Sequence, residues 1–321
     1  MIALLILLIG LSVLPLIYFL AAVSSQQPKE FKIKLSDPSR KPSDYYVTVV
    51  LNCTFPEFPK EMQTLGVIRR NFSETEATEL VQQLFNMALP LQLSRQDSWL
   101  SIRNDAQMAV LYHDGALMYH DDLTYSMSDI DWSAKSGLPD SSECEKIATA
   151  FLETFLEKLA DYGLVPGLAQ IEFAGVSVAA RRWDSETNAS RDTQMGVGYT
   201  LKYNGMPTAG FGGIEVLIGD QGKIEGLLVF WRNVELGRNV KVTISAEEAL
   251  KNIGSCDQLA HGLSSPRIER LIINKVELAY YVGPPVEKQN ELVPVYLFSA
   301  LAIREDGVQV ENLLWMPATS T

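Results

Sequence analysis

The folding pattern of this chain is clearest in Ser73-Glu-Thr-Glu-Ala-Thr-Glu-Leu-Val-Gln-Gln-Leu-Phe85. The segment opens with a Ser-x-x-Glu capping box, which satisfies free backbone N–H groups at a helix start, and its apolar residues then recur at i, i+3 and i+4. The same box recurs at Ser142-Glu-Cys-Glu145 and at Ser245-Ala-Glu-Glu248. Behind each predicted helix the apolar period changes from about 3.6 to about 2, which is typical of strands. The sequence therefore predicts an α+β fold of helix-on-antiparallel-sheet modules.

Hairpin turns are expected to join the strands behind each helix. Asp114-Gly115 separates two of them and favours a two-residue type I′ turn that places His120 opposite Ala109. Because such turns link neighbouring strands and no βαβ crossover is evident, the sheets are expected to be antiparallel. The expected strands cover residues 45–51, 108–112, 116–120, 198–203, 214–218, 223–231, 268–282, 293–304 and 308–315.

Composition and charge limit the possible classes of protein. The chain has 321 residues, of which 47% are hydrophobic and 21% charged, as expected of a body with a substantial folded core. Its net charge of -12 would repel phosphate backbones. Nucleic acid is therefore not an expected partner.

An apolar run at residues 2–23 is expected to be a transmembrane anchor. It carries no charged residue, and at about 1.5 Å per residue it spans roughly 33 Å, the thickness of a hydrocarbon core. Small residues near its end would allow cleavage, but its length favours an uncleaved signal anchor. Residues 24–43, rich in Ser, Gln, Pro and charge, are then expected to form a juxtamembrane linker.

The remaining chain is divided by a Ser-, Gly- and Pro-containing segment at 133–141, which is typical of a domain boundary. This predicts an N-terminal α+β domain at 44–137 and a C-terminal α+β domain at 138–321. Each domain would carry at least one of the predicted amphipathic helices on a sheet.

Cysteine spacing excludes two kinds of site. Cys53, Cys144 and Cys256 are widely separated and include no C-x-x-C pair, which argues against a zinc ribbon or a thioredoxin-type site. Cys144 falls in the first turn of a predicted helix, where the helix dipole can lower a thiol pKa, although an inert, half-buried cysteine is the commoner case. Glycosylation sequons begin at Asn52, Asn71 and Asn188 and matter only if the body is exported.

No metal, cofactor or catalytic centre is expected. His113 and His120, beside Asp114 and other acidic residues up to Asp131, are the best candidates for a metal site. In the predicted hairpin the two rings would lie four residues apart, roughly 13 Å, which one ion cannot bridge. Gly210-Phe-Gly-Gly213 lacks the helix and the Lys-Ser/Thr of a phosphate loop, so a bulge or a close backbone contact is expected there.

Four aromatic residues form the candidate partner surface. Trp231, Tyr280, Tyr281 and Trp315 lie in or beside predicted strands. Aromatics in such positions commonly pack against a helix, whereas an exposed set would mark a protein or peptide groove, because interfaces are enriched in Tyr and Trp.

Six features follow one another from residue 148 onward: the predicted helix with Phe151-Leu152, Tyr199-Thr-Leu-Lys-Tyr-Asn-Gly-Met-Pro207, Ile214-Glu-Val-Leu-Ile-Gly-Asp-Gln-Gly-Lys-Ile224, Ile244-Ser-Ala-Glu-Glu-Ala-Leu250, Val276-Glu-Leu-Ala-Tyr-Tyr281 and Pro294-Val-Tyr296. Their order resembles that of the YycH/YycI group of extracytoplasmic accessory proteins and, more loosely, the PepSY-like fold. This resemblance lies in the order of the features. It implies one transmembrane helix, a PepSY/YycI-like C-terminal domain, no enzyme activity, and regulation of a sensor histidine kinase through protein contacts. It also implies an extracytoplasmic body, although basic residues follow the apolar run and none precedes it, which by the positive-inside rule favours the opposite orientation.

The leading hypothesis is a noncatalytic, membrane-anchored, extracytoplasmic regulatory protein that contacts a sensor kinase or another envelope protein. The alternatives are an envelope hydrolase with paired carboxylates, which a deep acidic cleft would favour, and a small-ligand or peptide-binding protein, which an apolar pocket would favour.

Overall fold

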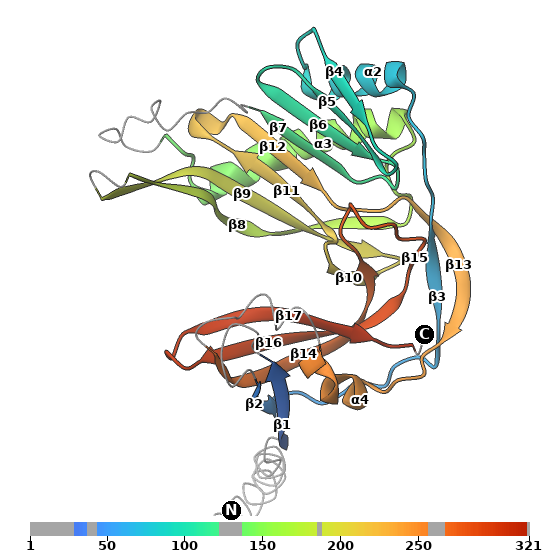
Figure 1. Cartoon of the computed structure of the whole chain (residues 1–321), viewed down its shortest axis with the longest axis vertical. Helices are drawn as coiled ribbons and strands as arrows, with labels where there is room; N and C mark the ends of the chain where they lie inside the picture. The colour runs from blue at the N-terminus through green and yellow to red at the C-terminus, as the bar shows by residue number, and fades with distance from the viewer. Residues whose placement is uncertain (1–28, 37–43, 122–136, 185–187, 256–266, 320–321) are drawn as a thin grey trace, which may run out of the picture. The chain divides into compact units, whose positions relative to one another are not determined.

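The computed structural model of the chain describes residues 29–36, 44–121, 137–184, 188–255 and 267–319 (Figure 1). The predicted anchor at 2–23, part of the predicted linker and Cys256 lie outside these residues. Within them, no helix is both long and apolar enough to cross a membrane. The described chain is mixed α+β, with much more strand than helix.

The chain forms two compact units that interleave along the sequence. Unit 1 comprises Met1–Pro56, Ala246–Glu277 and Phe298–Leu314, and unit 2 comprises Glu57–Ser245, Leu278–Leu297 and Trp315–Thr321. The division therefore does not follow the predicted linear boundary near residue 137. That boundary segment resembles a linker in composition, but such a signal cannot reveal that the chain returns to a unit it has left.

Unit 1 is a small sheet with short helical segments. Strand β1 (Lys29–Ser36) pairs antiparallel with β2 (Asp44–Leu51), and β2 pairs with the first part of β14 (Ile268–Val282). Strand β14 also pairs with β16 (Pro294–Arg304), which pairs with β17 (Gln309–Pro317). The helical segments are α4 (Ala246–Lys251) and η3 (Ile253–Ser255).

Strand β1 corrects the predicted linker at 24–43. Its sequence alternates charged residues with Phe31, Ile33 and Leu35, and the last two are buried. This period of 2 is that of a strand with one buried face. The high charge and proline content of the surrounding residues hid the alternation.

Unit 2 is built on a long antiparallel sheet in the order β8, β9, β11, β12, β7, β6, β5, β4. A second sheet in this unit has the order β13, β3, β15. The bounds are β3 Glu61–Val67, β4 Gln92–Arg95, β5 Trp99–Arg103, β6 Gln107–Tyr112, β7 Leu117–Asp121, β8 Ala169–Asp184, β9 Ala189–Tyr203, β10 Met206–Gly210, β11 Gly213–Ile218, η2 Asp220–Gly222, β12 Ile224–Val229, β13 Val234–Lys241 and β15 Glu291–Leu292.

Helices α2 (Glu74–Phe85) and α3 (Ser141–Asp161) pack against the long sheet through their apolar stripes. The ring of Phe85 stacks on Tyr119 of β7 with centroids 4.0 Å apart and lies 6.2 Å from the ring of Phe155 in α3. One aromatic cluster therefore joins both helices to the sheet, as the predicted amphipathic stripes require.

Two strand pairs in the described part of the chain are parallel, which corrects the expectation of purely antiparallel sheets. In unit 1, β14 pairs parallel with β2, with Arg270 opposite Thr48. In unit 2, β14 pairs parallel with β10, with Thr208 opposite Tyr280. The partners lie far apart in the sequence, so no turn motif marks the pairing.

The helix starts agree with the capping boxes in part. Ser73 is the N-cap of α2 and accepts a hydrogen bond from the backbone N–H of Glu76, as predicted. Helix α3 is instead capped by Asp140, which accepts from the backbone N–H of Glu143 at 2.9 Å. Asp140-Ser-Ser-Glu143 is itself a capping pattern, and it starts the helix before Ser142.

The β6–β7 hairpin has a three-residue loop in place of the predicted two-residue turn. The backbone N–H of Tyr112 donates to the carbonyl of Ala116 at 2.9 Å, so His113, Asp114 and Gly115 form the loop. The register consequently places His120 opposite Met108.

Strand β8 was not predicted from the sequence. It pairs with β9 along almost its whole length, with register shifts between Phe173 and Gly175, between Val178 and Ala180, and between Ala180 and Arg181. Within the described residues it pairs with no other strand.

A close backbone contact at Gly210 agrees with the expectation for the Gly210–Gly213 segment. Gly210 has φ +83°, and a Cβ at this position would lie 2.4 Å from the carbonyl oxygen of Val282. Only glycine fits both conditions without strain.

We expect Gly210→Ala to lower the free energy of unfolding by about 2–3 kcal/mol, because it combines a positive φ with a backbone clash. Gly205→Ala is the matched control: its φ is +79°, but nothing lies within 4 Å of the added Cβ. The control should cost about 1 kcal/mol. Urea unfolding of both variants measures the difference, and equal losses would contradict the assigned contact.

Candidate functional site

A polar pocket of about 320 Å³ lies in unit 2, within the range of roughly 300–1,000 Å³ common for small-molecule sites. Segments that are distant in the sequence meet around it: the residues after β3, the β4–β5 turn, the β6–β7 loop and the loop that follows β14. The lining residues are Arg69, Asp97, Ser98, His113, Asp114, Pro285, Val286, Glu287 and Lys288.

Arg232 connects two of the segments that form this pocket. Its side chain is 0% exposed, and its Nε lies 3.0 Å from Oδ2 of Asp114 in the β6–β7 loop. Its Nη2 donates to the carbonyls of Gly283 at 2.8 Å and Pro284 at 3.1 Å, which directly precede the pocket-lining residues Pro285 to Lys288. One guanidinium therefore sets the positions of both loops.

Burial and the partner's charge shift the pKa values of Asp114 and Arg232 in opposite directions. Burial raises the pKa of Asp114, and the charge of Arg232 opposes this effect. Burial lowers the pKa of Arg232, and Asp114 opposes that shift. Removing two charges from water costs several kcal/mol per ion, so the presence of such a pair does not by itself indicate a net gain in stability.

Further hydrogen bonds fix Arg232 and the β6–β7 loop. The phenol of Tyr203 accepts from the backbone N–H of Arg232 at 2.7 Å and lies 3.0 Å from its carbonyl oxygen. The indole N–H of Trp231 donates to the carbonyl of Gly115 at 2.8 Å. The loop is thus held by side chains from the segment after β12.

His113 lines the pocket as a largely buried ring. It is 9% exposed, and within the described chain its buried Nε2 has no hydrogen-bond partner. Burial, reinforced by the charges of Arg95 and Arg69, lowers the pKa of His113, while Asp114 acts in the opposite direction. The imidazole is therefore predominantly neutral at pH 7.

The wall at residues 283–290 is ordered by its own hydrogen bonds. The side chain of Gln289 accepts from the backbone N–H of Gly283 at 2.9 Å and donates to the carbonyl of Tyr281 at 2.9 Å. The backbone N–H of Glu287 donates to the carbonyl of Pro284 at 3.0 Å. Together with Arg232, these contacts make the loop a defined wall.

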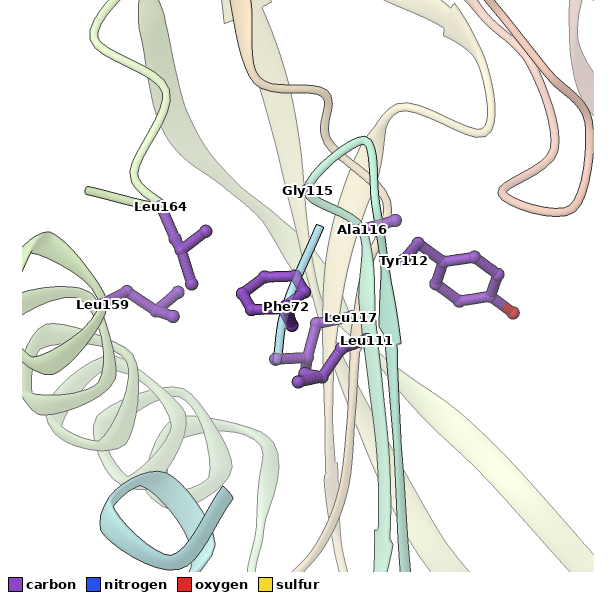
Figure 2. A pocket seen from close by; sticks show the side chains of 8 residues that line it. All are labelled: Phe72, Leu111, Tyr112, Gly115, Ala116, Leu117, Leu159 and Leu164. Carbon is purple, nitrogen blue, oxygen red and sulfur yellow. The ribbon is translucent and has the colours of Figure 1, made fainter. Parts of the chain in front are cut away.

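A second cavity in unit 2 is apolar and very small. Figure 2 shows Leu159 and Leu164 directed toward Phe72 and the leucines of β6 and β7. Its volume of about 10 Å³ is close to the minimum for one water molecule. It is therefore a packing defect and cannot serve as the apolar ligand pocket expected of a small-molecule carrier.

The four aromatic residues expected at a partner surface do not form one exposed set. Trp231 and Tyr280 are each 1% exposed, and the Tyr280 hydroxyl donates to the carbonyl of Gln63 at 2.7 Å. Tyr281 and Trp315 are half-buried, with ring centroids 4.1 Å apart, and pack on a cluster of apolar residues. Trp231 instead supports the pocket through its bond to Gly115.

The other candidates are placed as follows. His113 is buried and His120 exposed, and the described residues contain no cluster of His, Cys, Asp and Glu suited to a metal ion. The pKa of the buried Cys144 thiol is raised by burial and then by Asp140 and Glu143, so any effect of the helix dipole is outweighed. Asn52, Asn71 and Asn188 are exposed.

The roles of Arg232 and of the 283–290 wall were not predicted from the sequence. An arginine directly after an apolar strand was a signal, because charged residues rarely follow a buried strand without a partner. Gly283-Pro-Pro285 was a second signal for an ordered turn.

Arg232→Met should lower the free energy of unfolding by about 3–5 kcal/mol, because it leaves the Asp114 carboxylate buried without its counter-ion. Adding Asp114→Asn to this variant should restore about 1–2 kcal/mol of the free energy of unfolding, because it removes the unpaired buried charge. Lys202→Met is the control, because its pair with Glu172 is partly exposed and is worth about 0–1 kcal/mol. Urea unfolding of the single, double and control variants measures these changes. If the double variant recovers no stability, the unpaired charge of Asp114 is not the cause of the loss.

The neutral His113 predicts a pH dependence of stability. Its folded pKa lies below the ordinary value of 6.5, so below pH 6.5 the unfolded chain binds more protons and stability falls on acidification. His113→Gln should flatten this part of the profile. His120→Gln, at an exposed ring, should retain it. Unfolding free energies measured between pH 5 and pH 7 provide the test, and identical profiles for wild type and His113→Gln would exclude this origin.

No protein-family model and no curated protein sequence matches the chain. Among solved structures, the chain is similar to an uncharacterized protein from Eubacterium rectale, with 9% identity and a TM-score of 0.44 over 88% of this chain and 90% of that one. A distant structural neighbour is the Bacillus megaterium YpeB C-terminal domain, with 14% identity and a TM-score of 0.36 over 77% of this chain and 99% of that domain. We draw no conclusion on fold or function from similarities this distant, and the resemblance to the YycH/YycI group stays a prediction.

Proposed function

We propose that this chain is a noncatalytic, membrane-anchored binding protein with an extracytoplasmic body, which regulates another envelope protein according to the occupancy of the unit 2 pocket. The observation that carries the proposal is the fully buried Arg232, whose guanidinium fastens both the Asp114 loop and the Gly283–Pro284 segment. A site whose walls are held in this way is suited to recognition.

The energetic cost of Arg232 supports a role beyond folding. An apolar side chain of similar size, paired with an apolar residue in place of Asp114, would often fill such a space with equal or greater stability. The ion pair adds fixed positions for the two loops. We therefore infer that the pair serves the geometry of the pocket.

The same contacts exclude Asp114 as a catalytic carboxylate. Asp114 is buried, is paired with Arg232 and accepts from the backbone N–H of Ala116 at 3.4 Å. Its carboxylate is thereby committed to holding the loop. A hydrolase with paired carboxylates would therefore have to use the other two carboxylates of the pocket, Asp97 and Glu287.

The membrane and partner parts of the proposal rest on the sequence. The uncharged run at 2–23 supports a single membrane anchor. The resemblance to the YycH/YycI group and to PepSY-like modules supports an extracytoplasmic body and a sensor kinase as the regulated protein.

Three measurements on cells producing the full chain test this function. We expect the chain in the membrane fraction, its body degraded by external protease in intact cells, and a variant lacking residues 2–23 in the soluble fraction. Crosslinking of the full chain should recover a membrane protein, and Glu287→Lys in the pocket wall should change that recovery. A body protected until lysis would overturn the extracytoplasmic placement, and recovery unaffected by the pocket variant would overturn the regulatory role.

A further inference from the structure

We propose that the unit 2 pocket binds a small zwitterion, either a free amino acid or a short peptide that presents both an ammonium and a carboxylate group. This inference rests on the proposed binding function and specifies the chemistry of its ligand.

The charges of the pocket are balanced. Arg69 and Lys288 are its exposed cations, and Asp97 and Glu287 are its exposed anions. Asp114 does not change this balance, because Arg232 is its counter-ion. A ligand with only one sign of charge would therefore meet repulsion as well as attraction.

Both signs of charge occur in each group of lining segments. Arg69 and Asp97 come from the segments around β3 and β4, whereas Glu287 and Lys288 are neighbours on the 283–290 wall. Each group of segments thus offers one side chain for an ammonium and one for a carboxylate. This arrangement matches a ligand that carries both charges within a short distance.

The charged groups are available for a ligand. Among the described residues, no ion pair or hydrogen bond engages the side chains of Asp97, Glu287 and Lys288. Arg69 donates from Nη2 to the carbonyl of Gln289 at 3.3 Å, which orients its guanidinium and leaves other N–H donors for a carboxylate. An ammonium can in turn donate to the carboxylates of Asp97 and Glu287.

The size and the apolar part of the pocket agree with this ligand class. A volume of about 320 Å³ accommodates a free amino acid and leaves room for a second residue. Pro285 is buried in the wall, and the neighbouring Val286 is 64% exposed. These two residues offer an apolar surface beside the charged groups for a side chain of the ligand.

Calorimetric titration of the full chain in detergent tests the proposal. The probes are the proteinogenic L-amino acids and their homodipeptides, and each binder is compared with its N-acetyl and its C-amide derivative. We expect at least one zwitterion to bind and each single-charge derivative to bind about tenfold or more weakly, the loss expected for one charge-assisted contact. Preference for the amino acid or for the dipeptide identifies the source of the ligand.

Matched variants locate the binding. Lys288→Gln and Asp97→Asn should each weaken the affinity about tenfold or more. Lys241→Gln and Asp105→Asn remove exposed charges of the same types in unit 2 outside the pocket and should leave the affinity unchanged. Circular dichroism and the unfolding midpoint show that each variant is folded.

Three results would overturn the inference: no binding by any probe, equal binding of the single-charge derivatives, or equal effects of the pocket and control variants. The proposed function fails separately. If Glu287→Lys still alters crosslinking to a membrane protein while no zwitterion binds, the pocket is regulatory but recognises another chemistry. If a zwitterion binds and crosslinking is unaffected, the ligand class stands and the regulatory role falls.

Discussion

The guanidinium of Arg232 has been removed from water, and unit 2 must supply every contact that replaces the lost hydration. Asp114 balances the charge, the Gly283 and Pro284 carbonyls accept from one nitrogen, and Trp231's own carbonyl accepts from another at 3.1 Å. These contacts come from the segment after β12, the β6–β7 loop and the loop after β14. The requirement to satisfy one buried cation therefore fixes the positions of chain segments that share no regular secondary structure.

The interleaved chain imposes a different constraint. Strand β14 pairs in parallel with β2 in unit 1 and with β10 in unit 2. Both pairings join residues that are distant in the sequence. The entropic cost of closing the long intervening loops must therefore be overcome before the contacts contribute to stability. Neither unit consists of one continuous segment. We therefore expect neither of the linear fragments 44–137 and 138–321 to reproduce a complete unit.

Local signals predicted local structure well. The alternating residues of 268–282 gave the bounds of β14, and Ser73 gave the start of α2, because strand period and N-cap chemistry act within a few residues. The start of α3 was wrong because Asp140 and Ser142 head overlapping capping patterns. The parallel pairs and the Arg232 contacts were missed for another reason. The parallel pairs join β14 to the distant strands β2 and β10, and Arg232 contacts residues 51 and 52 positions away, so no turn motif or periodicity indicates these contacts.

The register shifts of β8 have a consequence for how the molecule behaves in a crowded solution. Within the described residues this strand pairs only with β9, so its other side presents backbone N–H and C=O groups that another chain could extend. A flat strand of 16 residues would be a template for aggregation. The shifts at Phe173, Val178 and Ala180 bend the strand, and the exposed Arg181 adds charge near its end. The irregularity of β8 thus protects the protein against edge-to-edge association.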